Sequence, residues 1–338
     1  MREPAFWYRP RSPTSHLLSP LGMLYGAITA RRMARKGFDA GIPVLCVGNY
    51  HVGGAGKTPT VLALTRLLRE LGETPVVLSR GYGGRLNGPV MVDRERHTAS
   101  DIGDEPLMMA RDVPVAVARD RLDGVALAKS QGATVILMDD GFQNPHLAKD
   151  ASLIVIDSER GLGNGKVFPA GPLRAPLGAQ LARTDALVLI GDGHGADDVA
   201  AKISARGKPV LRARLKPDAA SVARLSGKPV LAFAGIGDPE RFFRTLRASG
   251  IEVVRTRPFA DHHMFSPAEI AALAADARRE QLTLVTTEKD LARLRGIEGA
   301  PDGIVPFAVQ LEFDEPEKLR QLIGDHLYKS RERRFSAR

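Results

Sequence analysis

A glycine-rich segment ending in Gly-Lys-Thr is the part of this sequence best suited to chemistry on a polyphosphate. It reads Gly53-Gly54-Ala55-Gly56-Lys57-Thr58 and lies between a short apolar run, residues 44–47, and an apolar pattern at helical spacing, residues 61–71. Such a loop turns successive backbone N–H groups toward phosphates, and its lysine reaches the outer phosphates. We therefore expect these six residues to bind a nucleoside triphosphate, with Lys57 also serving catalysis and Thr58 holding a magnesium ion. His51 stands where the usual pattern has its first glycine.

An acidic pair follows another apolar run. Asp139 and Asp140 come directly after residues 133–138, which predict a buried strand. Downstream of a Gly-Lys-Thr loop, a carboxylate at the carboxyl end of a buried strand holds magnesium directly or through water. A cap on the following turn is the alternative role for one aspartate. The pair predicts that Asp139 or Asp140 lies near the metal.

Two further segments carry groups suited to proton transfer. Gly103-Asp104-Glu105-Pro106 places two carboxylates before a helix, and Asp261-His262-His263 follows a proline-anchored segment. A helix N-cap is the simpler role for Asp104, and a hydrogen-bonded loop residue is the simpler role for either histidine. Both interpretations stay open at this point.

Alternating strands and helices must position these groups. Apolar runs predict strands at residues 44–47, 76–78, 113–118, 133–138, 153–156 and 186–190, the pattern of a doubly wound, mostly parallel α/β sheet. After a pause at residues 216–218, strands at 230–234, 253–256, 284–287 and 305–309 and helices at 240–248, 267–279 and 315–327 predict a smaller α/β domain. We expect a P-loop domain at 37–218, the smaller domain at 219–328 and a frayed basic tail at 329–338.

The N-terminal segment, residues 1–36, predicts an amphipathic helix that has Ser19 as N-cap and Pro20 at its first position and ends at Gly37. Its apolar face and basic end suit a helix lying in a membrane surface rich in anionic lipid. A helix packed on its own domain with solvated arginines is an equal alternative. The run is too short to span a bilayer. The apolar face comprises Leu21, Leu24, Tyr25 and Ile28, and the basic end comprises Arg31, Arg32, Arg35 and Lys36.

Composition places the chain among soluble globular proteins of two domains. It has 338 residues, of which 43% are hydrophobic and 26% charged, and its net charge of +9 favours an anionic partner. Nucleic acid is the weakest candidate, because aromatic residues are only 5% and do not interleave with a basic stripe. Cys46 is the single cysteine and lies in a predicted strand. A single cysteine excludes an intramolecular disulfide and fits a reducing compartment.

Together these motifs resemble the tetraacyldisaccharide 4′-kinases, which phosphorylate a lipid A precursor at the inner membrane of Gram-negative bacteria. The resemblance covers nearly the whole chain, and its specificity comes from the order of eight motifs. Besides the loop at 47–59, it includes the segments 78–84, 103–106, 139–143, 171–174, 232–237, 261–262 and 286–290. His51 stands where the family has a hydroxylated residue, and Ala175 replaces the family's acidic residue.

The resemblance implies a P-loop kinase core joined to a smaller α/β domain, with ATP and Mg²⁺ as cofactors. The reaction would transfer the γ-phosphoryl group to the 4′-hydroxyl of a tetraacyldisaccharide 1-phosphate. Asp104 is then the candidate base and His262, oriented by Asp261, its relay, while Glu105, Arg121 and Arg174 are candidates for substrate and phosphate contacts. We expect a monomer held peripherally on the cytoplasmic face of the inner membrane.

Two other functions stay open from the residues alone. One is a nucleotide-driven, membrane-associated ATPase or GTPase switch, although Glu288-Lys289-Asp290 lacks the intervening residue of the Asn/Thr-Lys-x-Asp element that reads guanine. The other is a soluble small-molecule P-loop kinase whose N-terminal helix is part of the core.

Overall fold

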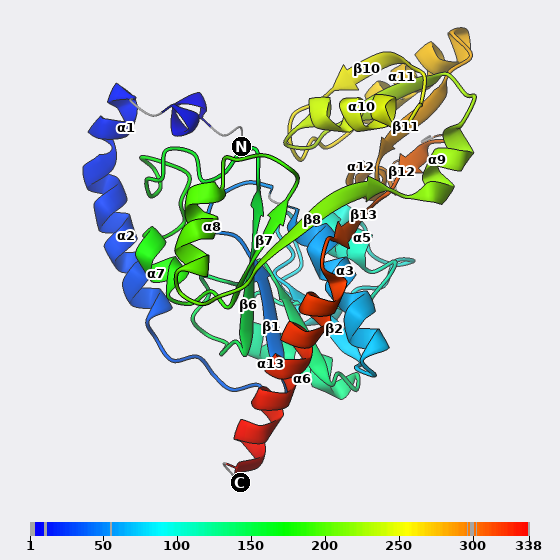
Figure 1. Cartoon of the computed structure of the whole chain (residues 1–338). Helices are drawn as coiled ribbons and strands as arrows, with labels where there is room; N and C mark the ends of the chain where they lie inside the picture. Colours follow the sequence, from blue (N-terminus) through cyan, green and yellow to red (C-terminus); the bar gives the residue numbers. More distant parts are fainter. Residues whose placement is uncertain are drawn as a thin grey trace.

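Two β-sheets of unequal size organise the chain (Figure 1). The computed structural model describes residues 4–9, 12–54, 56–295, 297, 301 and 303–336. The strand order is β13-β8-β7-β6-β1-β5-β2-β4-β3 in the larger sheet and β10-β9-β11-β12 in the smaller one. The mixed α/β architecture and the second, smaller domain agree with the prediction.

The larger sheet is parallel except at its two edges, where β13 pairs antiparallel with β8 and β3 pairs antiparallel with β4. Its central strands are buried on both faces, which explains why they read as continuous apolar runs. The six strands predicted for this domain are confirmed. The strands are β1 (Val44–Gly48), β2 (Pro75–Ser79), β3 (Val90–Met91), β4 (Val115–Val117), β5 (Val135–Asp139), β6 (Ala151–Asp157), β7 (Ala186–Ile190), β8 (Val210–Pro217) and β13 (Val309–Phe313).

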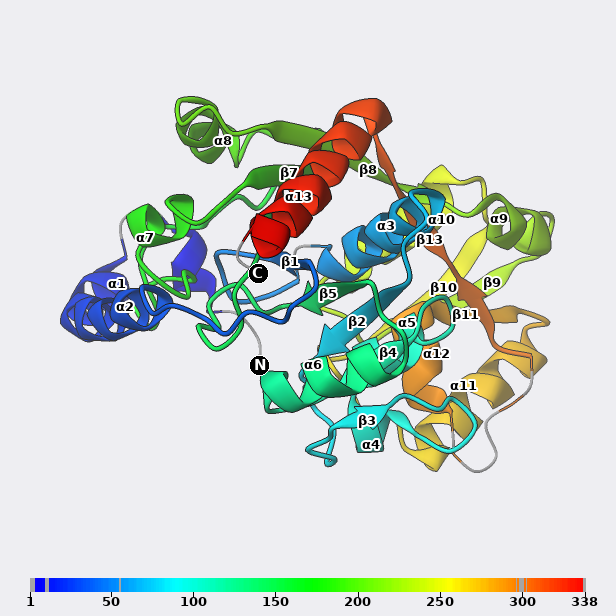
Figure 2. The same ribbon diagram turned by 90° about the horizontal axis from the view of Figure 1, so that it is seen from below.

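Helices cover both faces of this sheet (Figure 2). One apolar cluster joins the sheet to α3 (Lys57–Glu70), α4 (Ala99–Ile102), α5 (Asp104–Met109) and α13 (Pro316–Ser336). A second cluster joins the other face to α6 (Arg121–Ser130), α7 (Leu177–Leu181) and α8 (Asp197–Ser204). The helices cover the two faces of the sheet and leave its ends open. The carboxyl ends of the parallel strands therefore lie together at one open edge, where ligands of such folds bind.

The smaller domain repeats this layering around a fully parallel sheet. Its strands are β9 (Val230–Ala234), β10 (Val253–Pro258), β11 (Thr283–Thr287) and β12 (Val305–Phe307). The helices α9 (Ala219–Leu225) and α10 (Pro239–Ala248) share one apolar cluster, whereas α11 (Pro267–Arg279) and α12 (Glu288–Leu294) share the other.

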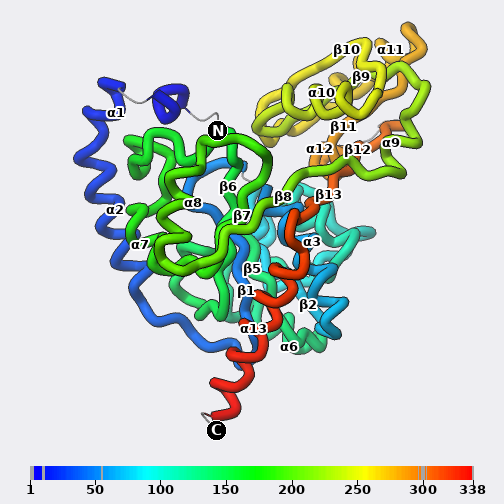
Figure 3. Tube along the Cα trace, in the orientation of Figure 1, coloured from blue at the N-terminus to red at the C-terminus, as the bar shows by residue number. Residues whose placement is uncertain are grey.

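The predicted strand at 305–309 is confirmed only over Val305–Phe307, because the chain then crosses back to the larger sheet. β12 pairs with β11, but β13 pairs with β8 in a register that sets Val309 opposite Pro217. Leu311 and Phe313 are buried while Gln310 and Glu312 are exposed, so an alternating pattern carries β13 against the large core. The smaller domain is thus inserted between β8 and β13 (Figure 3), and the predicted span 219–328 is too long at its C-terminal end.

The basic C-terminal segment is helical to Ser336, not frayed as expected. Three arginines of α13 hold it to the large domain through acidic partners: Arg331 pairs with Glu73, Arg333 with Asp150, and Arg334 with Asp39 and Asp150. These pairs explain why a segment with little apolar content stays ordered.

The N-terminal helix exists, but its amphipathic character is not confirmed. A short turn η1 (Ala5–Tyr8) and helix α1 (Pro13–Leu17) precede α2 (Ser19–Met33), in which Ser19 is the first helical residue and not the cap. The buried side of α2 consists of Gly22, Gly26, Thr29 and Met33, because small residues allow close approach. The apolar side chains Leu21, Leu24, Tyr25 and Ile28 are exposed. Opposite the apolar stripe the helix therefore carries small, packed residues.

No helix in the described part of the chain has the length and apolar content needed to cross a bilayer.

Candidate active site

The glycine loop lies between β1 and α3, as its sequence predicts. Gly53 and Gly56 have φ values of 112° and 82°, which L side chains rarely adopt, and a Cβ on Gly56 would collide with Ile190 at the end of β7. Gly56 caps α3, so Lys57 and Thr58 are the first two residues of that helix, and both are buried. Backbone N–H groups at this helix start form an anion site. Ala55 lies outside the described residues.

His51 supports this loop as a neutral group. Burial lowers the pKa of His51 to about 4, and its Nδ1 lies 3.0 Å from the carbonyl of Val52. Its own carbonyl accepts a hydrogen bond of 3.1 Å from Nε of Arg174. The residue in place of the usual glycine thus ties the loop to the segment that carries Arg174.

The two adjacent aspartates occupy very different environments. Arg174 binds Asp140 through two hydrogen bonds of 2.7 and 3.1 Å, and Nζ of Lys57 lies 3.7 Å from Oδ2 of Asp140. Burial opposes its ionisation, but Lys57 and Arg174 outweigh burial and lower the pKa of Asp140 to about 2. Asp140 is thus a charged partner of two cations, and φ of +48° turns it out of the strand.

Asp139, in contrast, has an unsatisfied oxygen. Its Oδ1 is buried and makes no hydrogen bond to any described residue. Burial, together with the charges of Glu105 and Asp140, raises the pKa of Asp139 to about 7. The pairing of β1 with β5 sets Val47 opposite Asp139, which brings this carboxyl to the foot of the loop. A cation there would satisfy the orphaned oxygen and relieve the crowded negative charge.

These groups fit magnesium better than a metal held by protein ligands alone. Among the described residues, no three His, Cys, Asp or Glu side chains are grouped to hold a metal. Mg²⁺ is commonly bound by one or two protein oxygens, with water and substrate phosphates completing its shell. The candidate donors are the carboxylate of Asp139 at the end of β5 and the hydroxyl of Thr58 at the start of α3.

Asp104 contacts two side chains of the smaller domain. Its Oδ2 accepts hydrogen bonds from Nε of Arg293 at 2.8 Å and from Nη2 of the same side chain, and lies 3.2 Å from Nδ1 of His262. Burial opposes ionisation of Asp104, but the hydrogen bond from His262 and the charge of Arg293 hold its pKa well below its usual range. Gly103, not Asp104, is the N-cap of α5, so the simple capping role does not apply.

His262 is oriented by Asp104, not by Asp261 as expected. The hydrogen bond to Asp104 raises the pKa of His262 above its ordinary value. Nε2 of His262 lies 3.9 Å from the nearest oxygen of Asp261, which is too long for a hydrogen bond. The imidazole thus has Nδ1 fixed on Asp104, whereas Nε2 is not held by Asp261.

The expected substrate-binding residues are paired within the protein. Glu105 forms an ion pair with Lys289 of α12, whose charge lowers the pKa of Glu105. Arg121 is buried at the start of α6, with Nη1 3.4 Å from the carbonyl of Ala118. Burial lowers its pKa, opposed by the nearby charge of Asp139. Arg174 is paired with Asp140 through two hydrogen bonds. A substrate contact by Glu105 or Arg174 would therefore share or exchange an existing partner, whereas Arg121 makes only one long hydrogen bond within the described part of the chain.

Sequence reasoning missed Arg293, which is buried and binds two carboxylates and a backbone carbonyl. Besides Asp104, it donates from Nη1 to Asp290 and to the carbonyl of Gly235, both at 2.7 Å. The only signal in the sequence is the spacing of Asp290 and Arg293 on one helix. That spacing predicts a local pair of opposite charges and says nothing of Asp104, which lies 189 residues away.

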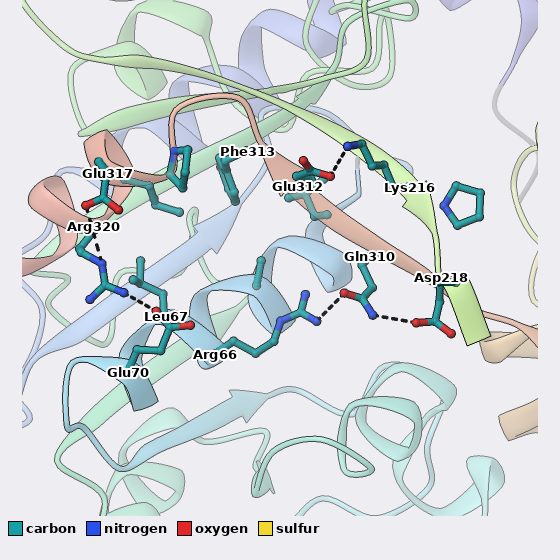
Figure 4. Close-up of a pocket in the computed structure, with 16 residues that line it drawn as sticks. Arg66, Leu67, Glu70, Lys216, Asp218, Gln310, Glu312, Phe313, Glu317 and Arg320 are labelled. Atoms are coloured by element: carbon teal, nitrogen blue, oxygen red, sulfur yellow. Dashed lines mark hydrogen bonds and ion pairs between the residues drawn. The ribbon is translucent and has the colours of Figure 1, made fainter. Parts of the chain in front are cut away.

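A separate groove of about 720 Å³ lies between α3, α13 and the β8–β13 ribbon (Figure 4). Figure 4 shows Gln310 between Arg66 and Asp218, with hydrogen bonds of 3.1 and 3.0 Å. The groove is not lined by the phosphate loop or by Asp104. Its polar contacts connect α3, the helix that begins at Lys57, to the β8–β13 ribbon, which joins the two domains.

A glycine loop between a buried strand and a helix, with an acidic pair at the end of the adjacent strand, defines a P-loop NTPase-type protein. The comparison with known proteins narrows this class. The chain belongs to the tetraacyldisaccharide-1-P 4′-kinase family, whose model matches residues 14–328. It is thus a kinase, and the nucleotide-driven switch is not favoured.

Relatives of the chain support this membership over its full length. It is 86% identical to a tetraacyldisaccharide 4′-kinase of Bradyrhizobium diazoefficiens over 338 residues, which is 100% of both chains. A protein of the same description from Nitrobacter winogradskyi is 66% identical over 334 residues, covering 98% of this chain and 99% of the relative. A crystal structure of LpxK from Aquifex aeolicus, described as an "apo" form in complex with ATP, is 28% identical with a TM-score of 0.73. The match covers 93% of this chain and 99% of that one.

Proposed function

We propose that the chain binds ATP in its glycine loop and transfers the γ-phosphoryl group to the 4′-hydroxyl of a tetraacyldisaccharide 1-phosphate, a lipid A precursor. One observation supports the proposal best: Lys57 and Thr58 begin the helix that follows the glycine loop, and the unsatisfied Oδ1 of Asp139 lies at the end of the strand paired with β1. The names of the relatives, and the Aquifex structure in complex with ATP, support the same function.

The loop would hold the nucleotide by charge and alignment. Backbone amides at residues 53–58 and the ammonium group of Lys57 would neutralise the phosphates, which is the main protein contribution when the transition state is loose. Lys57 now faces Asp140, and phosphate would compete for it. Arg174 and Arg121 would add positive charge at the same edge of the sheet.

Thr58 and Asp139 would hold magnesium, and the neighbouring carboxylate of Asp140 is the other candidate donor. Bound magnesium would neutralise charge on the phosphates during transfer. The unsatisfied Oδ1 of Asp139 is the feature of this chain that supports the assignment.

Asp104 and His262 would act together on the acceptor hydroxyl. The low pKa of Asp104 and its several donors make its carboxylate a poor proton acceptor by itself. We therefore assign proton acceptance to Nε2 of His262, with Asp104 fixing Nδ1–H and stabilising the imidazolium that forms. Arg293 would fix Asp104, and Asp261 would add negative charge near Nε2. Asp104 belongs to the larger domain and His262 to the smaller one. Turnover therefore requires the two domains to lie close together.

The acylated end of the acceptor would lie in the membrane. The exposed side chains Leu21, Leu24 and Ile28 of α2 would enter the interface, and the arginines after them would meet anionic headgroups. We place the protein peripherally on the cytoplasmic face of the inner membrane, as a monomer, with no nucleic-acid partner.

ATP turnover measured with and without a lipid disaccharide 1-phosphate acceptor tests the function. We expect turnover to depend on the acceptor and to be abolished in Lys57→Ala. ATP hydrolysis that is unchanged by the acceptor would refute the proposal, and full activity of Lys57→Ala would refute the site.

A further inference from the structure

Another contact between the domains lies on the other side of the phosphate loop. Arg241, in the first turn of α10, donates from Nη1 to Oδ2 of Asp157, the last residue of β6. The carboxylate is buried, and its Oδ1 accepts the backbone N–H groups of Glu159 and Arg160 at 3.0 and 3.2 Å. Asp157 is therefore fixed, whereas the Arg241 side chain is 34% exposed.

The guanidinium of Arg241 lies close to the end of β7, the strand whose last residue contacts the phosphate loop. A Cβ built on Gly191 would be 3.9 Å from Nη2 of Arg241, and Gly191 directly follows Ile190, the side chain packed against Gly56. Nη2 makes no hydrogen bond to any described residue. The guanidinium of Arg241, from the smaller domain, thus lies at the ends of β6 and β7. It is near Gly191, which directly follows the residue that contacts the loop, Ile190.

Arg241 lies on the opposite side of β1 from the groups that would act on the transferred phosphate. In the larger sheet, β6 and β7 lie on one side of β1, whereas β5, which ends in Asp139, lies on the other. Asp139 is in turn close to Glu105, the neighbour of Asp104. A nucleotide whose terminal phosphate points toward Asp139 and Asp104 would extend its remaining part toward β6 and β7.

We propose that Arg241 contacts the part of the bound nucleotide that is not transferred, and so helps to retain both ATP and ADP at the phosphate loop. This inference rests on the proposed nucleotide site in residues 53–58. Nη2 is available to donate to a phosphate or ribose oxygen while Nη1 stays on Asp157. Arginine suits this task, because its planar fork can serve two acceptors at once.

The competing interpretation is that Arg241 and Asp157 only hold the domains together. The two interpretations differ in what the Asp157 charge does. As a domain contact, the pair fails when either partner loses its charge. As a nucleotide contact, Arg241 keeps its function when Asp157 becomes Asn, because the amide oxygen still accepts the two backbone N–H groups.

Calorimetric titration of the full chain with ADP and with ATP tests the proposal. We expect Arg241→Ala to weaken both ligands by about tenfold and to the same extent, the size of a lost charge-assisted hydrogen bond. Arg241→Lys should recover part of the loss, and Asp157→Asn should stay within about twofold of the unmodified chain. Arg247→Ala, an exposed arginine of the same helix, is the matched control and should bind normally.

Four results would overturn the inference. Unchanged ADP affinity in Arg241→Ala, while Lys57→Ala abolishes binding, would reject Arg241 and leave the nucleotide site intact. Equal losses in Asp157→Asn and Arg241→Ala would show a domain contact alone. A loss for ATP but not for ADP would place Arg241 on the transferred phosphate. Absence of ADP binding by the unmodified chain would reject the nucleotide site and this inference together.

Discussion

Arg293 of the smaller domain binds Asp104 of the larger domain, with Nε 2.8 Å from Oδ2 and both side chains buried. The hydrogen bond from His262 and the charge of this arginine together keep Asp104 ionised despite its burial. It also links Asp104 to Asp290 and so gathers two buried carboxylates on one cation. The charge state of the candidate site therefore depends on a contact between the two domains.

Arg293→Ala should destabilise the protein strongly, because it leaves Asp104 and Asp290 buried without their cation. Breaking a buried pair from one side costs about 3–5 kcal/mol. The free energy of unfolding from denaturant titration measures the loss. Arg295→Ala, two residues along and exposed, should change it by less than about 0.5 kcal/mol. Similar values for the two variants would contradict the assigned role of Arg293.

Asp104→Ala and His262→Ala should each lower turnover by about a hundredfold or more, with little change in ADP affinity. If the two side chains act as one unit, the double variant should be no slower than the slower single variant. Steady-state kinetics on all three variants give the comparison. His263→Ala is the control, since Nε2 of His263 pairs with Glu269 and not with Asp104. Multiplied losses in the double variant would mean that the residues act separately.

The pH dependence should follow His262. Its hydrogen bond to Asp104 raises its pKa above the ordinary value of about 6.5, because the carboxylate favours the imidazolium. Since the neutral imidazole accepts the proton, kcat/KM should fall as the pH drops through this raised pKa. In Asp104→Asn the carboxylate charge is lost, so the apparent pKa should move downward. An NMR titration of the His262 ring tests the shift directly, and an unchanged pKa in that variant would exclude control by Asp104.

Leu24→Glu in α2 should reduce flotation with anionic vesicles while leaving ADP affinity unchanged. The side chain is 62% exposed, so a charge there disturbs no core, whereas deleting residues 1–36 would also remove the buried Trp7 and Met33. Leu122→Glu, at an exposed leucine of α6, is the matched control and should float like the unmodified chain. Equal flotation of the Leu24 variant and the unmodified chain would argue against membrane contact through α2.

The groups that sit at strand ends could be predicted from sequence, because local periodicity fixes both the strand and the residue after it. Asp139 ends β5, and Lys57 and Thr58 follow β1 through the glycine loop, so parallel strand order brings them to a common edge of the sheet. Partners that come from the other domain could not be predicted in this way. Nothing near residue 104 indicates Arg293, and nothing near residue 157 indicates Arg241, because sequence periodicity carries no information on long-range pairing.

The α2 helix shows a similar limit of pattern-based prediction. Its apolar stripe predicts a buried face in an isolated domain, but the residues that pack are the glycines. A glycine gives no apolar signal, although it permits the closest backbone approach, as Gly22 does beside Val167.

The return of the chain through β13 makes the smaller domain modular. Pro217 and Val309 are neighbours in the ribbon, so the chain leaves and re-enters the larger sheet at one place. Joining these two positions by a tight turn would delete His262, Lys289, Arg293 and Arg241 in a single cut, yet would leave the glycine loop and Asp139 in the remaining chain. Such a minimal protein would keep the nucleotide contacts of the loop and lose both the groups assigned to proton transfer and the proposed contact of Arg241.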